Sequence, residues 1–180
     1  MIWVVSGPTA VGKGTVVARL KQRHPEVFVS VSVTTRAPRP GEVDGADYHF
    51  ITEGEFDSLI ADGQLLEWAV VHGVSRYGTP RRPVIEAADA GRTVILEIDL
   101  QGAEQVRHTL PEAKWIFLAP PSWDELVRRL VGRGTENEEQ RERRLETAKR
   151  ELERQADFDY VVINHEIDST VTDLVALLGL

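Results

Sequence analysis

Short, nearly continuous apolar runs alternate with longer amphipathic segments along the chain. The clearest runs cover residues 2–5, 93–99, 115–119 and 160–163. Uninterrupted apolar runs of this length are typical of parallel strands that are buried on both faces. Residues 16–24 and 168–178 have the spacing of amphipathic helices. This alternation predicts an α/β fold in which a mainly parallel sheet core is flanked by helices.

Two stretches interrupt the alternation and are predicted to be inserts in the core. Residues 30–82 carry short strand candidates of their own, and residues 122–155 form the most charged part of the chain. The predicted core then consists of three segments, residues 1–29, 83–121 and 156–180. A core with two inserts suggests closure over two ligands.

The first insert has weaker and shorter signals. Its strand candidates are residues 27–35, where apolar and polar positions alternate, 48–51 and 65–71. Thr52 and Glu55 are predicted to form a capping box for a helix over residues 56–61. Residues 72–80 are predicted to form a loop, and Pro83 to be the first residue of the next helix.

Two helices are predicted in the second insert, over residues 122–131 and about 135–155, the second one capped by Thr135 and Glu138. The apolar stripe of that second helix is thin and consists of Leu145, Ala148 and Leu152. A helix that buries so little could move as a lid, or it could be a solvated helix supported by ion pairs four residues apart. The sequence leaves both interpretations open.

A glycine-rich stretch joins the first apolar run to the first helix. It consists of Gly7, Pro8, Thr9, Ala10, Val11, Gly12, Lys13, Gly14 and Thr15. Between a strand and a helix, the backbone N–H groups of such a loop converge on an anion and the lysine adds a charge, so we expect a nucleoside triphosphate. Gly14 stands where a hydroxyl residue usually follows the lysine, which leaves the Mg²⁺ ligand open. A turn whose glycines only allow positive φ is the simpler alternative.

Composition narrows the classes of function. The 180 residues include 21 basic and 29 acidic side chains, a net charge of -8 that argues against nonspecific binding to nucleic acid or anionic membranes. Without cysteine there is no disulfide and no cysteine-ligated metal, and the five histidines lack short metal-ligand spacing. No cationic leader and no run of membrane-spanning length is evident, so we expect a cytoplasmic protein.

Charged residues outside the loop fit the same chemistry. Two prolines and a glycine stiffen the segment that carries Arg36 and Arg39, and this display of guanidinium groups suits phosphate binding. Glu67 stands between two large apolar residues and needs a partner if it is buried. Asp99 ends an apolar run, at the edge of a parallel sheet where α/β proteins bind ligands.

Taken in order, these motifs resemble the guanylate kinase family over nearly the whole chain. They comprise the glycine-rich loop and residues 30–42, 47–50, 66–69, 77–79, 96–102 and 130–135. The resemblance implies transfer of a phosphoryl group from ATP to GMP, with Mg²⁺, giving ADP and GDP. It also implies a P-loop core, a mixed-β GMP-binding insert over residues 30–82 and a helical lid over residues 122–155. Use of dGMP is possible.

For recognition of the guanine base, the resemblance implies contacts from Glu67, Asp99, Ser32 and Thr79. Glu67 would accept hydrogen bonds from N1–H and the N2 amino group, a donor pair that adenine lacks, while a hydroxyl donates to O6. A structural ion pair is the alternative interpretation of Glu67.

For the GMP phosphate, the resemblance implies Arg36 and Arg39 with the hydroxyl groups of Tyr48 and Tyr77. Glu42 is grouped with these GMP-binding residues, and we expect it to orient an arginine. Solvated loop charges are the alternative interpretation of the two arginines.

For ATP, the resemblance implies contacts from the whole loop, Gly7 to Thr15, and from Asn164. The cations that it places around the transferred group are Lys13, Arg36, Arg129, Arg133 and Arg144. It implies that Mg²⁺ is held largely by phosphates and water, with Thr15 as the candidate protein ligand. His165 departs from the acidic residue that the family often has near the adenine base.

Two other functions remain alternatives. One is a catalytically silent module of the same fold that recognises phosphorylated protein segments, and the other is a kinase for another nucleoside monophosphate. The intact glycine-rich loop and the arginines of the second insert favour the kinase. We expect ATP and GMP as small-molecule partners, and no nucleic acid, membrane or obligate protein partner.

Overall fold

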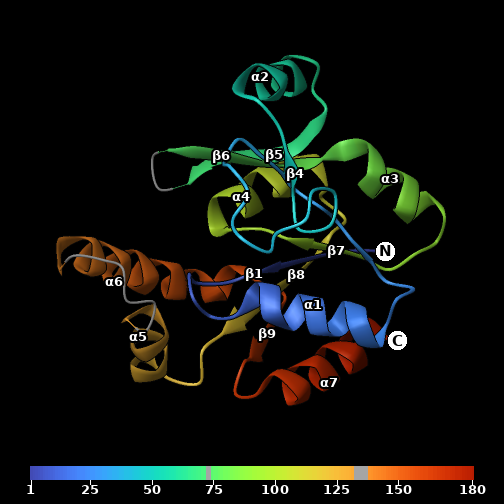
Figure 1. The fold of residues 1–180 in the computed structure, drawn as a ribbon. Helices are drawn as coiled ribbons and strands as arrows, with labels where there is room; N and C mark the ends of the chain where they lie inside the picture. The colour runs from blue at the N-terminus through green and yellow to red at the C-terminus, as the bar shows by residue number, and fades with distance from the viewer. Residues whose placement is uncertain (72–73, 132–137) are drawn as a thin grey trace.

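The computed structural model describes residues 1–71, 74–131 and 138–180, which contain two β-sheets (Figure 1). The strands of the central sheet follow the order β2-β7-β1-β8-β9, and all neighbouring pairs are parallel. Their bounds are Ile2–Ser6 (β1), Phe28–Val29 (β2), Val94–Glu97 (β7), Lys114–Ala119 (β8) and Tyr160–Ile163 (β9). The predicted parallel core is confirmed.

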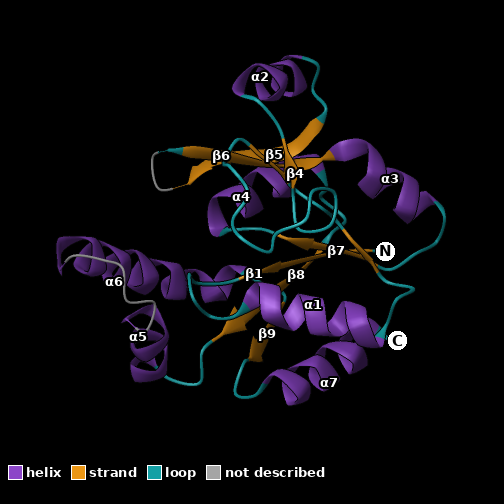
Figure 2. Cartoon of the chain, viewed as in Figure 1, coloured by secondary structure: helices purple, strands orange, loops and turns teal. Residues whose placement is uncertain are grey.

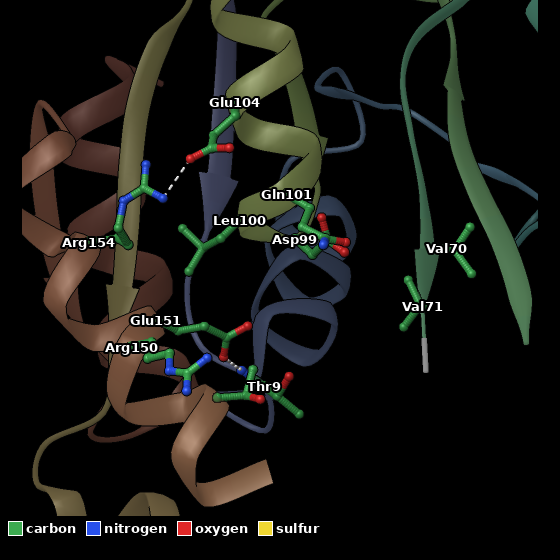
Figure 3. A pocket seen from close by; sticks show the side chains of 11 residues that line it. Thr9, Val70, Val71, Asp99, Leu100, Gln101, Glu104, Arg150, Glu151 and Arg154 are labelled. Atoms are coloured by element: carbon green, nitrogen blue, oxygen red, sulfur yellow. Dashed lines mark hydrogen bonds and ion pairs between the residues drawn. The ribbon is translucent and has the colours of Figure 1, made fainter. Parts of the chain in front are cut away.

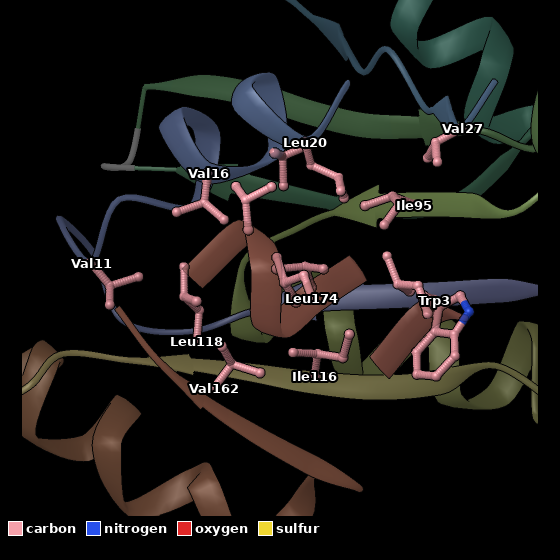
Figure 4. Packing of buried hydrophobic residues seen from close by; sticks show 14 of the residues in the cluster. Trp3, Val11, Val16, Leu20, Val27, Ile95, Ile116, Leu118, Val162 and Leu174 are labelled. Carbon is pink, nitrogen blue, oxygen red and sulfur yellow. The ribbon is translucent and has the colours of Figure 1, made fainter. Parts of the chain in front are cut away.

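Helices cover both faces of the central sheet (Figure 2). They are α1 (Lys13–Arg23), α3 (Arg81–Asp89), α4 (Leu100–Thr109) and α7 (Ile167–Leu178). Alternate residues of β1 point to opposite faces, so Trp3 and Val5 pack with α1 and α7, whereas Val4 packs with α3 and α4. Figure 4 shows the first of these clusters, in which Leu20 and Leu174 are fully buried. Burial on both faces explains the uninterrupted apolar runs of β1, β7 and β8.

The second sheet has the strand order β4-β3-β6-β5 and combines parallel and antiparallel pairs. Its strands are Val33–Thr34 (β3), His49–Phe50 (β4), Leu65–Val71 (β5) and Ser75–Pro80 (β6). The helix α2 (Glu53–Ala61) packs on this sheet through the fully buried Phe56, and the predicted capping box between Thr52 and Glu55 is present. The helix α4 lies between the two sheets and contacts both β1 and β5 (Figure 1).

The prediction of a loop over residues 72–80 is wrong for residues 75–80, which form β6; residues 72 and 73 lie outside the described part. Glycine and proline in this segment suggested a turn, but antiparallel pairing with β5 determines its conformation. Close packing explains Gly78, because a Cβ there would lie 2.9 Å from the Leu65 side chain. The glycine therefore belongs to a strand whose neighbours leave no room for a side chain.

Three further features of the secondary structure differ from the predictions. The run over residues 27–35 is not one strand, because β2 joins the central sheet and β3 joins the second. The helix α3 begins at Arg81 and not at Pro83, since a proline is tolerated throughout a first turn, where N–H groups have no partner within the helix. The helix α4 was not predicted from the sequence.

The segment predicted to be the second insert contains α5 (Trp123–Val131) and α6 (Glu138–Glu153), followed by a short 3-10 helix, η1 (Arg154–Asp157). The N–H of Glu125 donates to the Ser122 hydroxyl (3.2 Å) at the start of α5. The predicted cap at Thr135 lies outside the described residues. In α6, Ala148 is fully buried in the core cluster with Leu145 and Leu152 packed beside it, so its thin stripe does contact the core. None of the described helices has the length and apolar character to cross a membrane.

Candidate functional site

The glycine-rich loop follows β1 and leads directly into α1. Gly7 has a φ of +152°, and a Cβ there would lie 2.2 Å from the carbonyl oxygen of Leu118. Gly12 caps α1 with a φ of +99°, and its Cβ would lie 2.8 Å from Nδ2 of Asn164. Only glycine combines these φ values with such close neighbours. The loop thus packs tightly against β8 and the segment after β9 while the N-terminus of α1 provides N–H donors for an anion.

Lys13 is the first residue of α1 and folds back over the loop. Its Nζ donates to the carbonyl oxygens of Gly7 (2.6 Å) and Pro8 (3.3 Å). Burial lowers the pKa of Lys13, while the nearby carboxylates of Glu97, Glu151 and Asp99 raise it. The Lys13 side chain thus lies at the mouth of the loop, with three carboxylates near it that oppose the effect of burial on its pKa.

A cavity of about 280 Å³ is lined by Lys13 and by residues of both sheets and their connections. It collects seven of the site residues predicted from the sequence: Lys13, Ser32, Arg39, Tyr48, Glu67, Tyr77 and Asp99. Ala69, Val71, Glu97 and Ile98 complete the lining. Residues far apart in the sequence therefore form one polar hollow beside the glycine-rich loop.

Glu67 is the buried carboxylate of this cavity, on β5, with an exposure of 6%. Its Oε1 accepts a hydrogen bond from the Thr79 hydroxyl (2.5 Å) on β6. The partner of the buried carboxylate in this hydrogen bond is therefore a hydroxyl group and not a cation. Burial raises the pKa of Glu67 to about 7, and the charge of Asp99 adds to the shift. Its Oε2 lies over the start of α4, so close to Gly102 that a Cβ on this glycine would be 2.5 Å from it.

Arg36 is held beside the cavity by a rigid set of contacts. Its Nη1 and Nη2 each donate to a carboxylate oxygen of Glu42 at 2.9 Å, and its Nε donates to the Tyr77 hydroxyl (3.0 Å). The hydrogen bonds from Arg36 and from the Arg39 N–H lower the pKa of Glu42. Glu42 thus orients an arginine, as expected from the sequence, and neither it nor Arg36 lines the cavity itself.

A second hollow, of about 630 Å³, shares no lining residue with the first cavity and is lined by Gly12, Thr15, Arg129 and Asn164, among others. Arg129 donates to the carbonyl oxygens of Val11 (3.1 Å) and Asn164 (3.3 Å), and Asn164 Nδ2 also donates to Val11 (2.8 Å). These bonds fix the back of the loop. Thr15 is exposed and lines this hollow, not the cavity that Lys13 lines.

A third cavity, of about 470 Å³, adjoins the first and shares Val71 and Asp99 with it (Figure 3). Here Glu151 of α6 points at the loop, and its Oε2 accepts a hydrogen bond from the Thr9 N–H (2.9 Å). Burial raises the pKa of Glu151, and the Thr9 hydrogen bond opposes the shift. One backbone N–H group of the loop thus already donates its hydrogen bond to a carboxylate of the protein.

Two acids near the loop were not among the predicted site residues. Glu97 ends β7 and lines the first cavity, and its carboxylate lies 3.4 Å from the position that a Cβ on Gly14 would take. Its position at the carboxyl end of an apolar run was a signal that could have found it. Glu151 follows Ala148 by one helical turn, so an acid beside the apolar stripe of α6 was the corresponding signal.

Of the lid arginines predicted from the sequence, Arg144 lies half-buried on α6 and Arg133 lies outside the described residues. Within the described part of the chain, no group of three or more histidine, aspartate or glutamate side chains is arranged to hold a metal ion.

The chain is similar to known proteins over nearly its whole length. The profile of the family described as guanylate kinase matches residues 1–179. The chain is 63% identical to a guanylate kinase of Cutibacterium acnes over 177 residues, covering 98% of this chain and 89% of the relative. It is 58% identical to one of Mycobacterium sp. over 176 residues, covering 97% and 89%. The crystal structure of guanylate kinase from Anaplasma phagocytophilum matches with a TM-score of 0.81 and 36% identity, over 99% of this chain and 84% of that one.

Proposed function

The chain belongs to the guanylate kinase family, and from this premise we propose that it transfers the γ-phosphoryl group of ATP to GMP, giving ADP and GDP. One observation carries the assignment of GMP as acceptor: a buried carboxylate, Glu67, shares a cavity with the lysine of the glycine-rich loop. A base-reading group and a phosphate-binding group therefore face the same hollow.

Guanine presents the donor pattern that this cavity can satisfy. A carboxylate with one oxygen held by Thr79 and the other over α4 can accept from N1–H and from the N2 amino group. Adenine offers no such pair and would leave the buried carboxylate without partners, at a cost of about 1–3 kcal/mol per unmatched group. We assign Ser32, Thr79 and Asp99 to the remaining contacts of the base.

The GMP phosphate is assigned to Arg39, Tyr48 and Tyr77, with Arg36 approaching from its bidentate pair with Glu42. Guanidinium groups match phosphate oxygens in geometry and charge. Because Glu42 and Tyr77 already orient Arg36, little side-chain entropy remains to be lost when the phosphate binds.

The reaction needs no general base. The attacking oxygen belongs to a phosphate monoester that carries about -1.5 to -2 charges at neutral pH. The protein has to align two anions in line and to cover the shifting negative charge with cations. We assign these tasks to Lys13 and to Arg36, Arg129, Arg133 and Arg144.

The residues fit a Mg²⁺ ion that arrives with the nucleotide, because Mg²⁺ usually keeps phosphate oxygens and water as ligands. Gly14 supplies no oxygen, but the Glu97 carboxylate lies beside it, and Thr15 is the next hydroxyl. We propose Glu97 as the protein group near the ion, which would offset phosphate charge when bound. Glu97 shares the cavity of Lys13. Thr15, the metal ligand expected from the sequence, lines the second hollow and not the cavity of Lys13.

The proposal includes the division of the chain into a core (1–29, 83–121 and 156–180), a GMP-binding insert (30–82) and a lid (122–155). It also includes a cytoplasmic location, and the lack of cysteine is compatible with this location. The strands of the second sheet all lie inside the proposed insert, and this supports the first boundary.

A coupled assay of ADP formation with Mg-ATP tests the function. GMP should drive ADP formation, and Glu67→Gln should lower kcat/KM for GMP by roughly 100-fold or more while the KM for ATP stays nearly constant. Glu86→Gln, at an exposed carboxylate of α3, is the matched control and should behave like the wild type.

Two outcomes would favour the alternatives. No GMP-dependent ADP formation would reject the kinase in favour of a silent module that recognises phosphorylated segments. Equal turnover of GMP, AMP and dTMP would reject the role of Glu67 in selecting the base.

A further inference from the structure

The strand β5, which carries Glu67, is the last strand in the order of its sheet. One edge pairs with β6, and the helix α4 packs against the strand on its other side. The pairing with β6 shifts register between Leu65 and Glu67. Such an irregularity disrupts the ladder locally, and Glu67 is the first residue after it that pairs with β6, opposite Thr79.

The side chain of Gln105 on α4 takes the place of a neighbouring strand. Its Oε1 accepts a hydrogen bond from the Trp68 N–H (3.1 Å), and its Nε2 donates to the Trp68 carbonyl oxygen (2.6 Å). A primary amide has one acceptor and one donor group, so it satisfies both backbone groups of one residue, as a hydrogen-bonded pair in an antiparallel sheet does.

A second contact holds the residue on the other side of Glu67. The Thr109 hydroxyl, also on α4, donates to the Leu66 carbonyl oxygen (3.1 Å). The backbone is therefore attached to α4 immediately before and immediately after Glu67. Its side chain lies between these two attachments and reaches the start of the same helix.

One face of α4 provides all these elements. Gly102, Gln105 and Thr109 are spaced by three and four residues and so lie on the same side of the helix. Gly102 leaves the space that the Glu67 carboxylate occupies, and its N–H donates to Asp99 (2.7 Å), the N-cap of α4. The helix thus sets the distance between the two carboxylates, Glu67 and Asp99, that we assign to the guanine base.

We propose that Gln105 is a positioning residue for base selection, which holds β5 so that the Glu67 carboxylate meets both donors of guanine. This inference rests on the proposed function. Hydrogen bonds weaken steeply when their geometry degrades, and on one side Gly102 leaves no spare room, so a small shift of β5 costs one of the two bonds. The N2 amino group is the donor that separates guanine from hypoxanthine, so selection of GMP over IMP reports this bond.

The test compares GMP and IMP as acceptors for the wild type and for Gln105→Met, which has nearly the same shape but lacks both hydrogen bonds. We expect kcat/KM for GMP to fall roughly tenfold, the GMP-to-IMP ratio of kcat/KM to fall by a similar factor, and the KM for ATP to stay within about twofold. Thr109→Val should shift the ratio in the same direction by less. His108→Met, at an exposed position of the same helix, should leave it unchanged.

The ratio separates positioning from stability, because a smaller folded fraction lowers both rates equally. A GMP-to-IMP ratio equal to that of the wild type in both Gln105→Met and Thr109→Val would overturn the inference, whatever the total activity. Failure of the proposed function would give a different result. The wild type itself would show no GMP-dependent ADP formation, and this would contradict both proposals.

Discussion

If Glu67 binds the guanine base as proposed, GMP use should depend on pH. Burial raises the pKa of its carboxyl to about 7, and only the ionised form accepts both guanine donors. Below about pH 7 the folded protein holds a protonated Glu67, so kcat/KM for GMP should fall towards a slope of roughly tenfold per pH unit. The measurement is the pH profile of kcat/KM for GMP at saturating Mg-ATP.

The GMP phosphate also titrates, at about pH 6, so the profile needs a reference. Glu67→Gln keeps the phosphate titration but has no carboxyl to protonate, and its profile should lose the step near pH 7. Identical profiles for the wild type and this variant would contradict the role of Glu67.

At the level of side chains, the sequence predicted the contacts that form between residues close together in the chain. The stiff segment with its two prolines indicated the arginine display, and the pairing of Arg36 with Glu42, six residues apart, follows from that local geometry. The contacts of Glu151 and Gln105 could not be predicted in this way, because their partners, Thr9 and Trp68, are 142 and 37 residues away. Contacts of this kind depend on how elements pack.

The close approach of α4 and β5 predicts an effect of Gly102 that runs against helix propensity. Alanine is favoured over glycine inside a helix by about 1 kcal/mol, but a Cβ at Gly102 would lie 2.5 Å from Oε2 of Glu67 and 3.0 Å from its Cδ. Gly102→Ala should therefore displace the carboxylate and lower kcat/KM for GMP by roughly tenfold, with the KM for ATP unchanged. Steady-state kinetics in both substrates measures this.

Gly54→Ala is the matched control for that substitution. Gly54 is also helical, in α2, and a Cβ there meets nothing within 4 Å. It should raise the melting temperature and leave GMP use unchanged. Equal kinetics for the two variants would contradict the steric role of Gly102.

The elements that the sequence predicted well are those whose own pattern determines them. The inner strands β1, β7 and β8 are mostly apolar because both faces are buried, and the Thr52 and Glu55 capping box sets the start of α2. The strand β6 and the helix α4 are different cases. Pairing with β5 imposes an extended conformation on a segment rich in turn residues. The helix α4 was missed because Gly102, whose contact with Glu67 leaves no room for a side chain, lies in its first turn and has a low helix propensity.

Residues of both sheets line the cavity that Lys13 and Glu67 share. A substrate bound there should therefore affect local opening in both sheets. Lys13 and Glu97 belong to the loop and strands of the central sheet, whereas Glu67 and Tyr77 belong to the second sheet. A ligand that fills the cavity therefore bridges both sheets. The hollow at Asn164 is lined only by residues of the core and of α5.

Hydrogen exchange of backbone amides should separate the two substrates. GMP should slow exchange in β5 and β6, because contacts with Glu67 and Tyr77 oppose local opening of the second sheet. A non-hydrolysable ATP analogue should instead slow exchange in the glycine-rich loop and at the start of α1, with little effect on β5 and β6. Glu67→Gln should lose the GMP effect at a nucleotide concentration that saturates the wild type and keep the ATP effect. Protection of β5 and β6 by the ATP analogue alone, or by GMP equally in the variant, would contradict GMP binding at the shared cavity.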